Sequence, residues 1–89
     1  MERLRQEFKK IESHFFGKPL EVMRCLLADP KGQAHRAKLM TEVWQETVPM
    51  FGTIRQAVRR LNLALTDHNF GYVVRGCRKG IYRIVPIEK

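Results

Sequence analysis

The sequence predicts a mainly α domain in which a core of three helices is followed by a small C-terminal β-hairpin, with an amphipathic helix in front of this core. A chain of 89 residues, 44% of them hydrophobic, fits one globular unit. Apolar residues recur at helical spacing over much of the chain, whereas two β-branched runs flank a glycine-containing turn near the C-terminus. We therefore divide the chain into an N-terminal helix within residues 1–18 and a main domain over residues 19–89.

Residues 2–16 have the pattern of an amphipathic helix. Leu4, Phe8, Ile11 and Phe15 follow one another at spacings of four, three and four residues, which places them on one side. Gly17 is expected to end this helix, because glycine suits a helix C-cap. The apolar side either packs on the domain's own core or forms a homodimer or connector seam, and the sequence leaves both readings open.

The first core helix is expected to begin at Pro19, a residue that suits the first helical position. Its core stripe comprises Leu20, Met23, Leu26 and Leu27. The following Asp-Pro-Lys-Gly segment, residues 29–32, predicts a turn, because aspartate can bond its own backbone and glycine and proline interrupt helices.

A second core helix is predicted over residues 35–45, with Leu39, Val43 and Trp44 facing inward. Alanine and histidine stand where a serine or threonine cap is common, so its start is expected to be poorly capped. A loop is expected from residue 45 to 52.

The third core helix is predicted to run from Thr53 to about Asp67. Thr53 and Gln56 match a capping box, in which two side chains satisfy free backbone amides at a helix start. Residues 69–71 then break the helix. Residues 72–74 and, apart from Arg83, residues 81–85 are β-branched or aromatic, and a turn with two glycines separates the two runs, which predicts a hairpin.

Positive charge is concentrated in the C-terminal part of the chain. Residues 1–50 carry 9 basic and 7 acidic side chains, a balance of +2, whereas residues 51–89 carry 8 and 2, a balance of +6. A positive field of this kind attracts a polyanion, most simply a nucleic acid.

The pattern argues against several other classes of protein. Cys25 and Cys77 form no CxxC pair, and the histidines show no metal-ligand spacing, so we expect neither a metal nor another cofactor. The single serine, Ser13, is a sequence neighbour of His14, and nothing resembles a nucleophile-base arrangement, so we expect no enzyme and no catalytic residue. No run approaches the roughly 20 apolar residues of a membrane span, and a cytoplasmic, nucleoid-associated location is expected.

The predicted helix from Thr53 has two chemically different sides. Ile54, Val58, Leu61 and Leu65 fall in one sector, as expected of a buried stripe. Arginine can pair with guanine, and glutamine or asparagine with adenine, so the remaining side suits the major groove of DNA. The candidate base-contacting residues of this helix are Arg55, Gln56, Arg59, Arg60, Asn62 and Leu63.

The predicted hairpin is also basic, and long cationic side chains at a hairpin tip can reach phosphates or the minor groove. The candidate DNA-contacting residues of the hairpin are Arg75, Arg78, Lys79 and Arg83.

The segment from Leu20 to Ile84 resembles the DNA-binding domain of the OmpR/PhoB family of bacterial transcription regulators. The similar stretches are HRAKLMTEVW (35–44), TIRQAVRRLNLAL (53–65) and VVRGCRKGIYRI (73–84). This resemblance implies a winged helix-turn-helix, with residues 53–65 as the recognition helix and the hairpin as the wing. The sequence contains no phosphate-receiver segment, so we expect either a piece of a longer protein or a small regulator controlled in another way.

The resemblance further implies phosphate contacts near the start of the second core helix, and it aligns residues 45–52 with a loop that touches RNA polymerase in some members. Sequence-specific binding of double-stranded DNA in transcriptional regulation is therefore the leading interpretation. The alternatives are a winged-helix protein-interaction adaptor and a non-specific nucleic-acid binder. The candidate phosphate contacts are His35, Arg36, Lys38 and Thr53.

Overall fold

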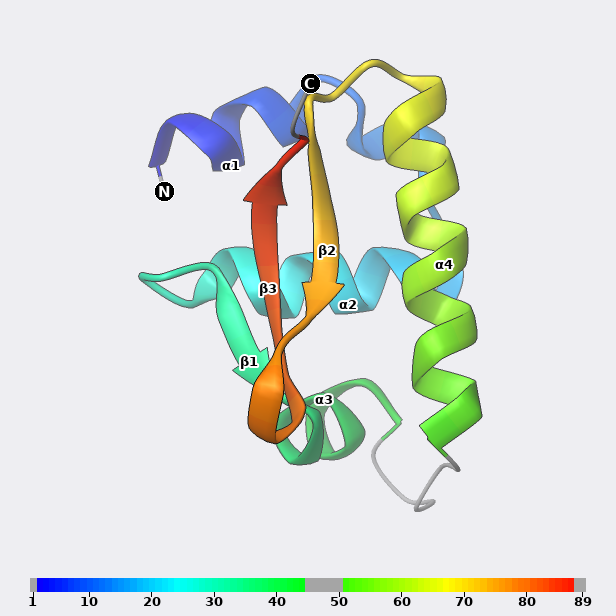
Figure 1. Ribbon diagram of the computed structural model, residues 1–89. Coiled ribbons are helices and arrows are strands. Elements are labelled where there is room, and N and C mark those ends of the chain that lie inside the picture. Colours follow the sequence, from blue (N-terminus) through cyan, green and yellow to red (C-terminus); the bar gives the residue numbers. More distant parts are fainter. Residues whose placement is uncertain (1, 45–50, 88–89) are drawn as a thin grey trace.

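The computed structural model of the chain describes residues 2–44 and 51–87. Within them a set of helices is followed by a C-terminal hairpin that packs against the helices, so the predicted mainly α fold with a small sheet is confirmed (Figure 1). The elements are α1 (Glu2–Lys9), a 3-10 turn (Glu12–His14), α2 (Gly17–Ala28), β1 (Gln33–His35), α3 (Arg36–Val43), α4 (Phe51–Asp67), β2 (Tyr72–Gly76), a second 3-10 turn (Arg78–Gly80) and β3 (Ile81–Pro86).

One hydrophobic core joins the helices to the inner face of the sheet. In Figure 1, α2 crosses behind the strands, while α4 runs along one side of them. The predicted stripes of the core helices lie in the core: Leu20 and Trp44 are partly buried against it, and the other predicted residues are buried, namely Met23, Leu26, Leu27, Leu39, Val43, Ile54, Val58, Leu61 and Leu65.

The sheet has three antiparallel strands in the order β1-β3-β2. Strands β2 and β3 form the predicted hairpin, in which Val74 lies opposite Ile84 and both side chains are buried. Strand β1 was not predicted, because Gln33–His35 contains no β-branched residue and no phenylalanine, tyrosine or tryptophan. It pairs with β3 some 50 residues further along the chain, with Ala34 opposite Tyr82.

The N-terminal helix is shorter than predicted. It ends at Lys9 rather than Phe16, and Gly17 (φ 71°) opens α2 instead of closing the first helix. Packing explains the break, because Phe8 and Phe15 would be separated by about 10 Å along a continuous helix. Their ring centroids are 5.0 Å apart, and both side chains are buried.

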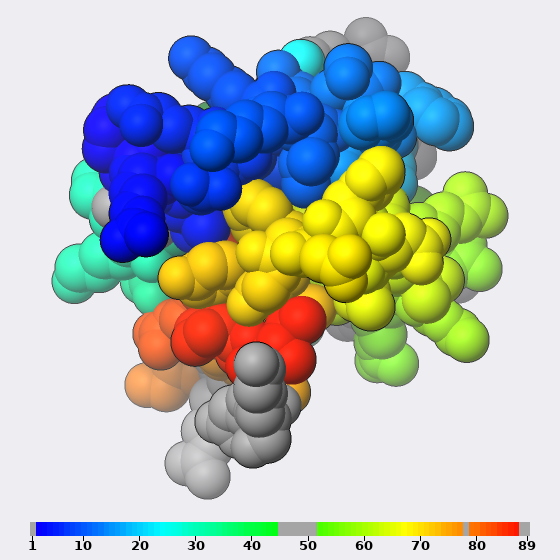
Figure 2. Space-filling view, turned by 90° about the horizontal axis from the view of Figure 1, so that it is seen from above, coloured from blue at the N-terminus to red at the C-terminus, as the bar shows by residue number. Residues whose placement is uncertain are grey.

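The apolar side of the N-terminal segment packs on the chain's own core. Leu4 and Ile11 are partly buried against the same cluster that contains Phe8 and Phe15. Seen from above in Figure 2, this segment lies across the molecule beside the turn between α4 and β2. The arrangement follows the first of the two sequence readings, and a homodimer through these four residues would have to compete with this packing.

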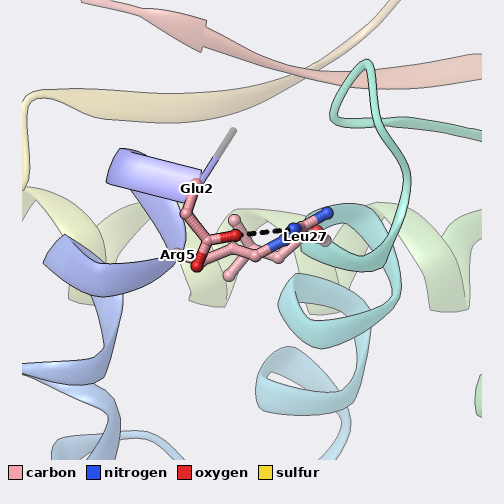
Figure 3. A network of polar contacts seen from close by, with 3 residues as sticks. All are labelled: Glu2, Arg5 and Leu27. Carbon is pink, nitrogen blue, oxygen red and sulfur yellow. Dashed lines mark hydrogen bonds and ion pairs between the residues drawn. The ribbon is translucent and has the colours of Figure 1, made fainter.

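A polar network anchors α1 to the end of α2 (Figure 3). The Nε atom of Arg5 donates a hydrogen bond to the carbonyl oxygen of Leu27 at 2.5 Å. Its guanidinium also forms an ion pair with Glu2 at 3.3 Å. The last carbonyls of a helix have no partner within the helix, so Arg5 satisfies a group that α2 leaves free.

Two predictions about helix starts were wrong. The side chain of His35 caps α3, since its Nδ1 atom accepts a hydrogen bond from the backbone amide of Ala37 at 3.0 Å. Helix α4 begins at Phe51, so Thr53 lies in its first turn and is not the N-cap of a capping box. The predicted loop of residues 45–52 lies outside the described residues except for its last two, which belong to α4.

Two predicted chain reversals are confirmed. The Asp29 carboxylate accepts hydrogen bonds from the amides of Lys31 and Gln33, which closes the turn before β1. At the end of α4, Asn69 adopts a left-handed conformation with φ 53°, and the amide of Phe70 bonds back to the carbonyl of Leu65. This is the hydrogen-bond pattern of a Schellman cap, and it turns the chain from α4 into β2.

Candidate nucleic-acid interface

Helix α4 presents a basic side to solvent because its apolar stripe is used in the core. Arg55, Gln56, Arg59 and Arg60 are all exposed, and the side chain of Leu63 is 59% exposed. No acidic residue occurs between Arg55 and Thr66. The five exposed residues predicted for base contacts therefore share one accessible surface.

Asn62 differs from its neighbours on α4. Its side-chain amide donates a hydrogen bond to the carbonyl of Val74 at 2.9 Å and accepts one from the Val74 amide at 2.8 Å. Both ends of the amide group are thus engaged with β2, and the side chain is only partly exposed. Asn62 positions the hairpin against α4 rather than presenting its amide to solvent.

The hairpin places two arginines directly opposite each other. Arg75 on β2 pairs in register with Arg83 on β3, and both side chains are exposed. The Arg83 guanidinium donates two hydrogen bonds to Oε1 of Gln33, at 3.0 and 3.2 Å. Like charges directly opposite in a sheet are unfavourable without a counter-charge, so this outer face favours an anion.

The tip of the hairpin, residues 77–80, lies next to the start of α3. Lys79 is exposed and adopts φ 64°, while Gly80 adopts φ 76°. A Cβ atom on Gly80 would lie 3.0 Å from the Cδ atom of Arg36, so glycine lets the tip approach α3 closely. The side chain of Arg78 lies outside the described part of the structure.

The predicted phosphate contacts fall in two places. His35 and Arg36 lie at the start of α3 near the hairpin tip, Lys38 follows in the first turn of the same helix, and all three residues are exposed. Thr53 is exposed in the first turn of α4. Arg36 from this set and Gly80 of the hairpin are brought into contact, a proximity that the sequence did not reveal.

Cations are paired differently in the two halves of the chain. Among the described residues, the salt bridges join Glu2 to Arg5, Glu7 to Lys10, Lys18 to Glu21 and Glu12 to Arg24. All eight of these residues precede β1. Among the described residues, Arg55, Arg59 and Arg60 of α4 and Arg75 and Arg83 of the hairpin form no salt bridge with a carboxylate, so their charge is available to an external anion.

A groove separates α4 from the hairpin. It has a volume of about 580 Å³ and includes Arg55, Arg59 and Leu63 of α4 together with Gly76 and Tyr82 of the hairpin. Sequence reasoning did not find it, because the groove depends on how far β2 stands from α4.

The part of the chain that the structure describes offers neither a metal-ligand cluster nor a membrane-spanning helix. Residues 2–44 and 51–87 contain no cluster of three or more histidine, cysteine or acidic side chains that could hold a metal ion. No helix within them has the length and apolar character needed to cross a membrane.

Comparison of the chain with models of known protein families, with curated proteins and with solved structures finds no match.

Proposed function

We propose that this protein is a winged-helix domain of the OmpR/PhoB type that binds double-stranded DNA sequence-specifically and regulates transcription. The observation that carries the proposal is the exposed basic side of α4, whose arginines have no carboxylate partner among the described residues. A helix that buries one stripe and presents arginine and glutamine on the other side suits the major groove.

The proposed mechanism is non-catalytic. Arg55, Arg59 and Arg60 pair with guanine acceptors, and Gln56 pairs with adenine. Exposed Leu63 contacts a thymine methyl group, because apolar side chains recognise that group in the major groove. Asn62 is left out of base reading because its amide holds β2.

The hairpin and the start of α3 supply affinity rather than sequence preference. Arg75, Lys79 and Arg83 bind phosphates or enter the minor groove, and Arg36 and Lys38 of α3 bind the DNA backbone. Each neutralised phosphate releases counterions, which makes the affinity depend on salt. Binding to chromosomal DNA places the protein with the bacterial nucleoid, and contact with RNA polymerase belongs to the same proposal.

Selection from random duplex DNA tests this function. The purified protein is incubated with the pool at several salt concentrations, and the retained DNA is sequenced. A recurring motif with a steep salt dependence is expected, and a symmetric motif would indicate binding as a dimer. A steep salt dependence without a motif would replace sequence-specific regulation by non-specific binding.

A protein-interaction adaptor is the second candidate function. It is favoured by Phe16, whose side chain is 83% exposed at the start of α2, beside a hollow that includes Pro19 and Arg60. Exposed aromatic side chains are enriched in protein interfaces. Failure to retain any duplex at low salt would select this candidate, because the basic side of α4 would then have no nucleic-acid role.

A further inference from the structure

The groove between α4 and the hairpin has the size of a small-molecule site. Its volume of about 580 Å³ lies within the range of roughly 300–1,000 Å³ that is typical of ligand pockets. Val58 and Leu63 from α4 and the ring of Tyr82 from β3 provide apolar surface. A pocket with apolar walls and a few polar groups is the usual form of such sites.

Gly76 lines the groove beside Tyr82 and contributes no side chain to it. Gly76 lies opposite Tyr82 in the hairpin register. A Cβ atom built on Gly76 would lie 3.4 Å from Cε1 of Tyr82, so the aromatic ring lies over this glycine. A longer side chain at position 76 would occupy space that now belongs to the groove.

The groove is also held in shape before any ligand binds. The two hydrogen bonds between Asn62 and Val74 fix β2 to α4 at the level of Val74. Binding to a site that is already formed avoids the cost of ordering it, which favours small ligands with few contacts.

The charge in the groove is positive near the hairpin tip. Arg55 and Arg59 line it and form no ion pair among the described residues. The acidic residue on its lining, Asp67, lies eight residues after Arg59, which is about 12 Å further along the helix. An anionic group is therefore attracted to the end of the groove that Arg55 and Tyr82 share.

We propose that this groove binds a small aromatic carboxylate. The carboxylate accepts hydrogen bonds from Arg59 and Arg55, since the guanidinium fork matches a carboxylate. The aromatic ring packs against Tyr82, Val58 and Leu63. Ligand binding itself does not require DNA. Its consequence, competition between the ligand and DNA for Arg55 and Arg59, rests on the proposed function.

The apolar surface distinguishes this ligand from a simple anion. A free phosphate, or a phosphate of the DNA backbone, would pair with the same arginines and leave the accessible apolar surface of Tyr82 and Leu63 uncovered. An aromatic carboxylate satisfies the charge and removes this apolar surface from water, so it gains a contribution that phosphate does not.

Titration of the isotopically labelled full chain, followed by NMR, tests the proposal with three probes. 2-Naphthoate is expected to shift the amide signals of Gly76, Tyr82 and Leu63 and to saturate at a Kd of about 0.1–1 mM, as ligand size suggests. 2-Naphthamide keeps the aromatic ring but has no negative charge, whereas inorganic phosphate has the charge but no ring. Each is expected to bind at least about tenfold more weakly than 2-naphthoate. Equal binding of 2-naphthamide or of inorganic phosphate, or shifts scattered over the surface, would overturn the proposal.

Three variants locate the site. Arg59→Ala is expected to weaken 2-naphthoate binding by about fivefold or more, and Gly76→Leu to abolish it by filling the groove. Gly76 does not have a positive φ, so leucine causes no backbone strain there. Arg60→Ala removes the same charge from a position on α4 that does not line the groove, and it should change the affinity for 2-naphthoate less than about twofold. Equal effects of the two arginine variants would refute the location.

A competition experiment separates this proposal from the DNA proposal. Once a duplex is selected, 2-naphthoate at saturating concentration is expected to release it from the wild-type chain but not from Gly76→Leu. If the chain binds 2-naphthoate in the groove but binds no DNA, the ligand site stands and only its proposed role in regulating DNA binding is removed. Naphthoate that fails to bind a chain which does retain DNA overturns the site alone.

Discussion

Asn62 of α4 and Val74 of β2 are joined by a reciprocal pair of hydrogen bonds, at 2.9 and 2.8 Å. The Asn62 amide pairs with the backbone of Val74 as a neighbouring strand would. Strand β2 is at the edge of the sheet, where unpaired backbone groups invite pairing with other chains. Asn62 therefore protects this edge and sets the distance between the proposed recognition helix and the wing.

Replacement of Asn62 by alanine should destabilise the protein by about 1–3 kcal/mol, because the amide and carbonyl of Val74 would lose their partners in a partly buried place. Urea unfolding followed by circular dichroism measures this change. Gln56→Ala, on the exposed side of the same helix, is the matched control and should stay within about 0.5 kcal/mol of wild type. Equal stability of the two variants would contradict the structural role of Asn62.

Phe8 and Phe16 provide a matched test of the N-terminal packing. The side chain of Phe8 is 1% exposed and contacts Phe15 and Phe70, whereas that of Phe16 is 83% exposed. Phe8→Ala is expected to lower the free energy of unfolding by about 3–5 kcal/mol, and Phe16→Ala by less than about 0.5 kcal/mol. A small effect of Phe8→Ala, or an effect that depends on protein concentration, would favour the homodimer seam instead.

The sequence predicted what is encoded within one segment. The two sides of α4 follow from local spacing, and the Asp29 turn and the hairpin follow from local turn residues. Contacts between distant segments were not predictable. In the sequence, Asn62 is one of several polar residues of the helix, and only the folded structure shows that it contacts Val74. The break after Lys9 escaped for the same reason, because the contact between Phe8 and Phe15 imposes it and no helix-breaking residue marks it.

The Asp29 turn makes stability depend on pH in the acid range. The hydrogen bond from the backbone amide of Lys31, and to a smaller extent that from Gln33, hold the pKa of the Asp29 carboxyl below its usual value. A lowered pKa in the folded state stabilises the protein above the unfolded-state pKa of about 3.9, and this contribution is lost as the pH falls through the folded-state value. Asp29→Ala should therefore be less stable than wild type at pH 7, with a difference that shrinks below about pH 4. Urea midpoints between pH 7 and 3 measure it, and a constant difference would argue against this role.

The two cysteines are expected to react at very different rates. Cys25 is buried and donates a hydrogen bond to Glu42 at 2.9 Å. Burial first, and then this hydrogen bond, raise the pKa of the Cys25 thiol to about 12. Cys77 is exposed at the hairpin tip. Because the thiolate is the reactive form, a disulfide reagent at pH 8 should modify one thiol rapidly in the native protein and the second only after unfolding. Cys77→Ser should remove the rapid phase, and two rapid phases in the native protein would contradict the assignment.

Arg59 and Lys79 should affect DNA binding in different ways. Arg59 lies on the exposed side of α4, so Arg59→Ala is expected to weaken a selected site by about 1–3 kcal/mol and a scrambled duplex much less. Lys79 is exposed at the hairpin tip, so Lys79→Ala should weaken both duplexes about equally and lower the salt slope by about one. Fluorescence anisotropy with both duplexes across a salt series measures these effects. Equal losses on both duplexes for Arg59→Ala would assign Arg59 to the phosphate backbone and leave base reading to its neighbours on α4.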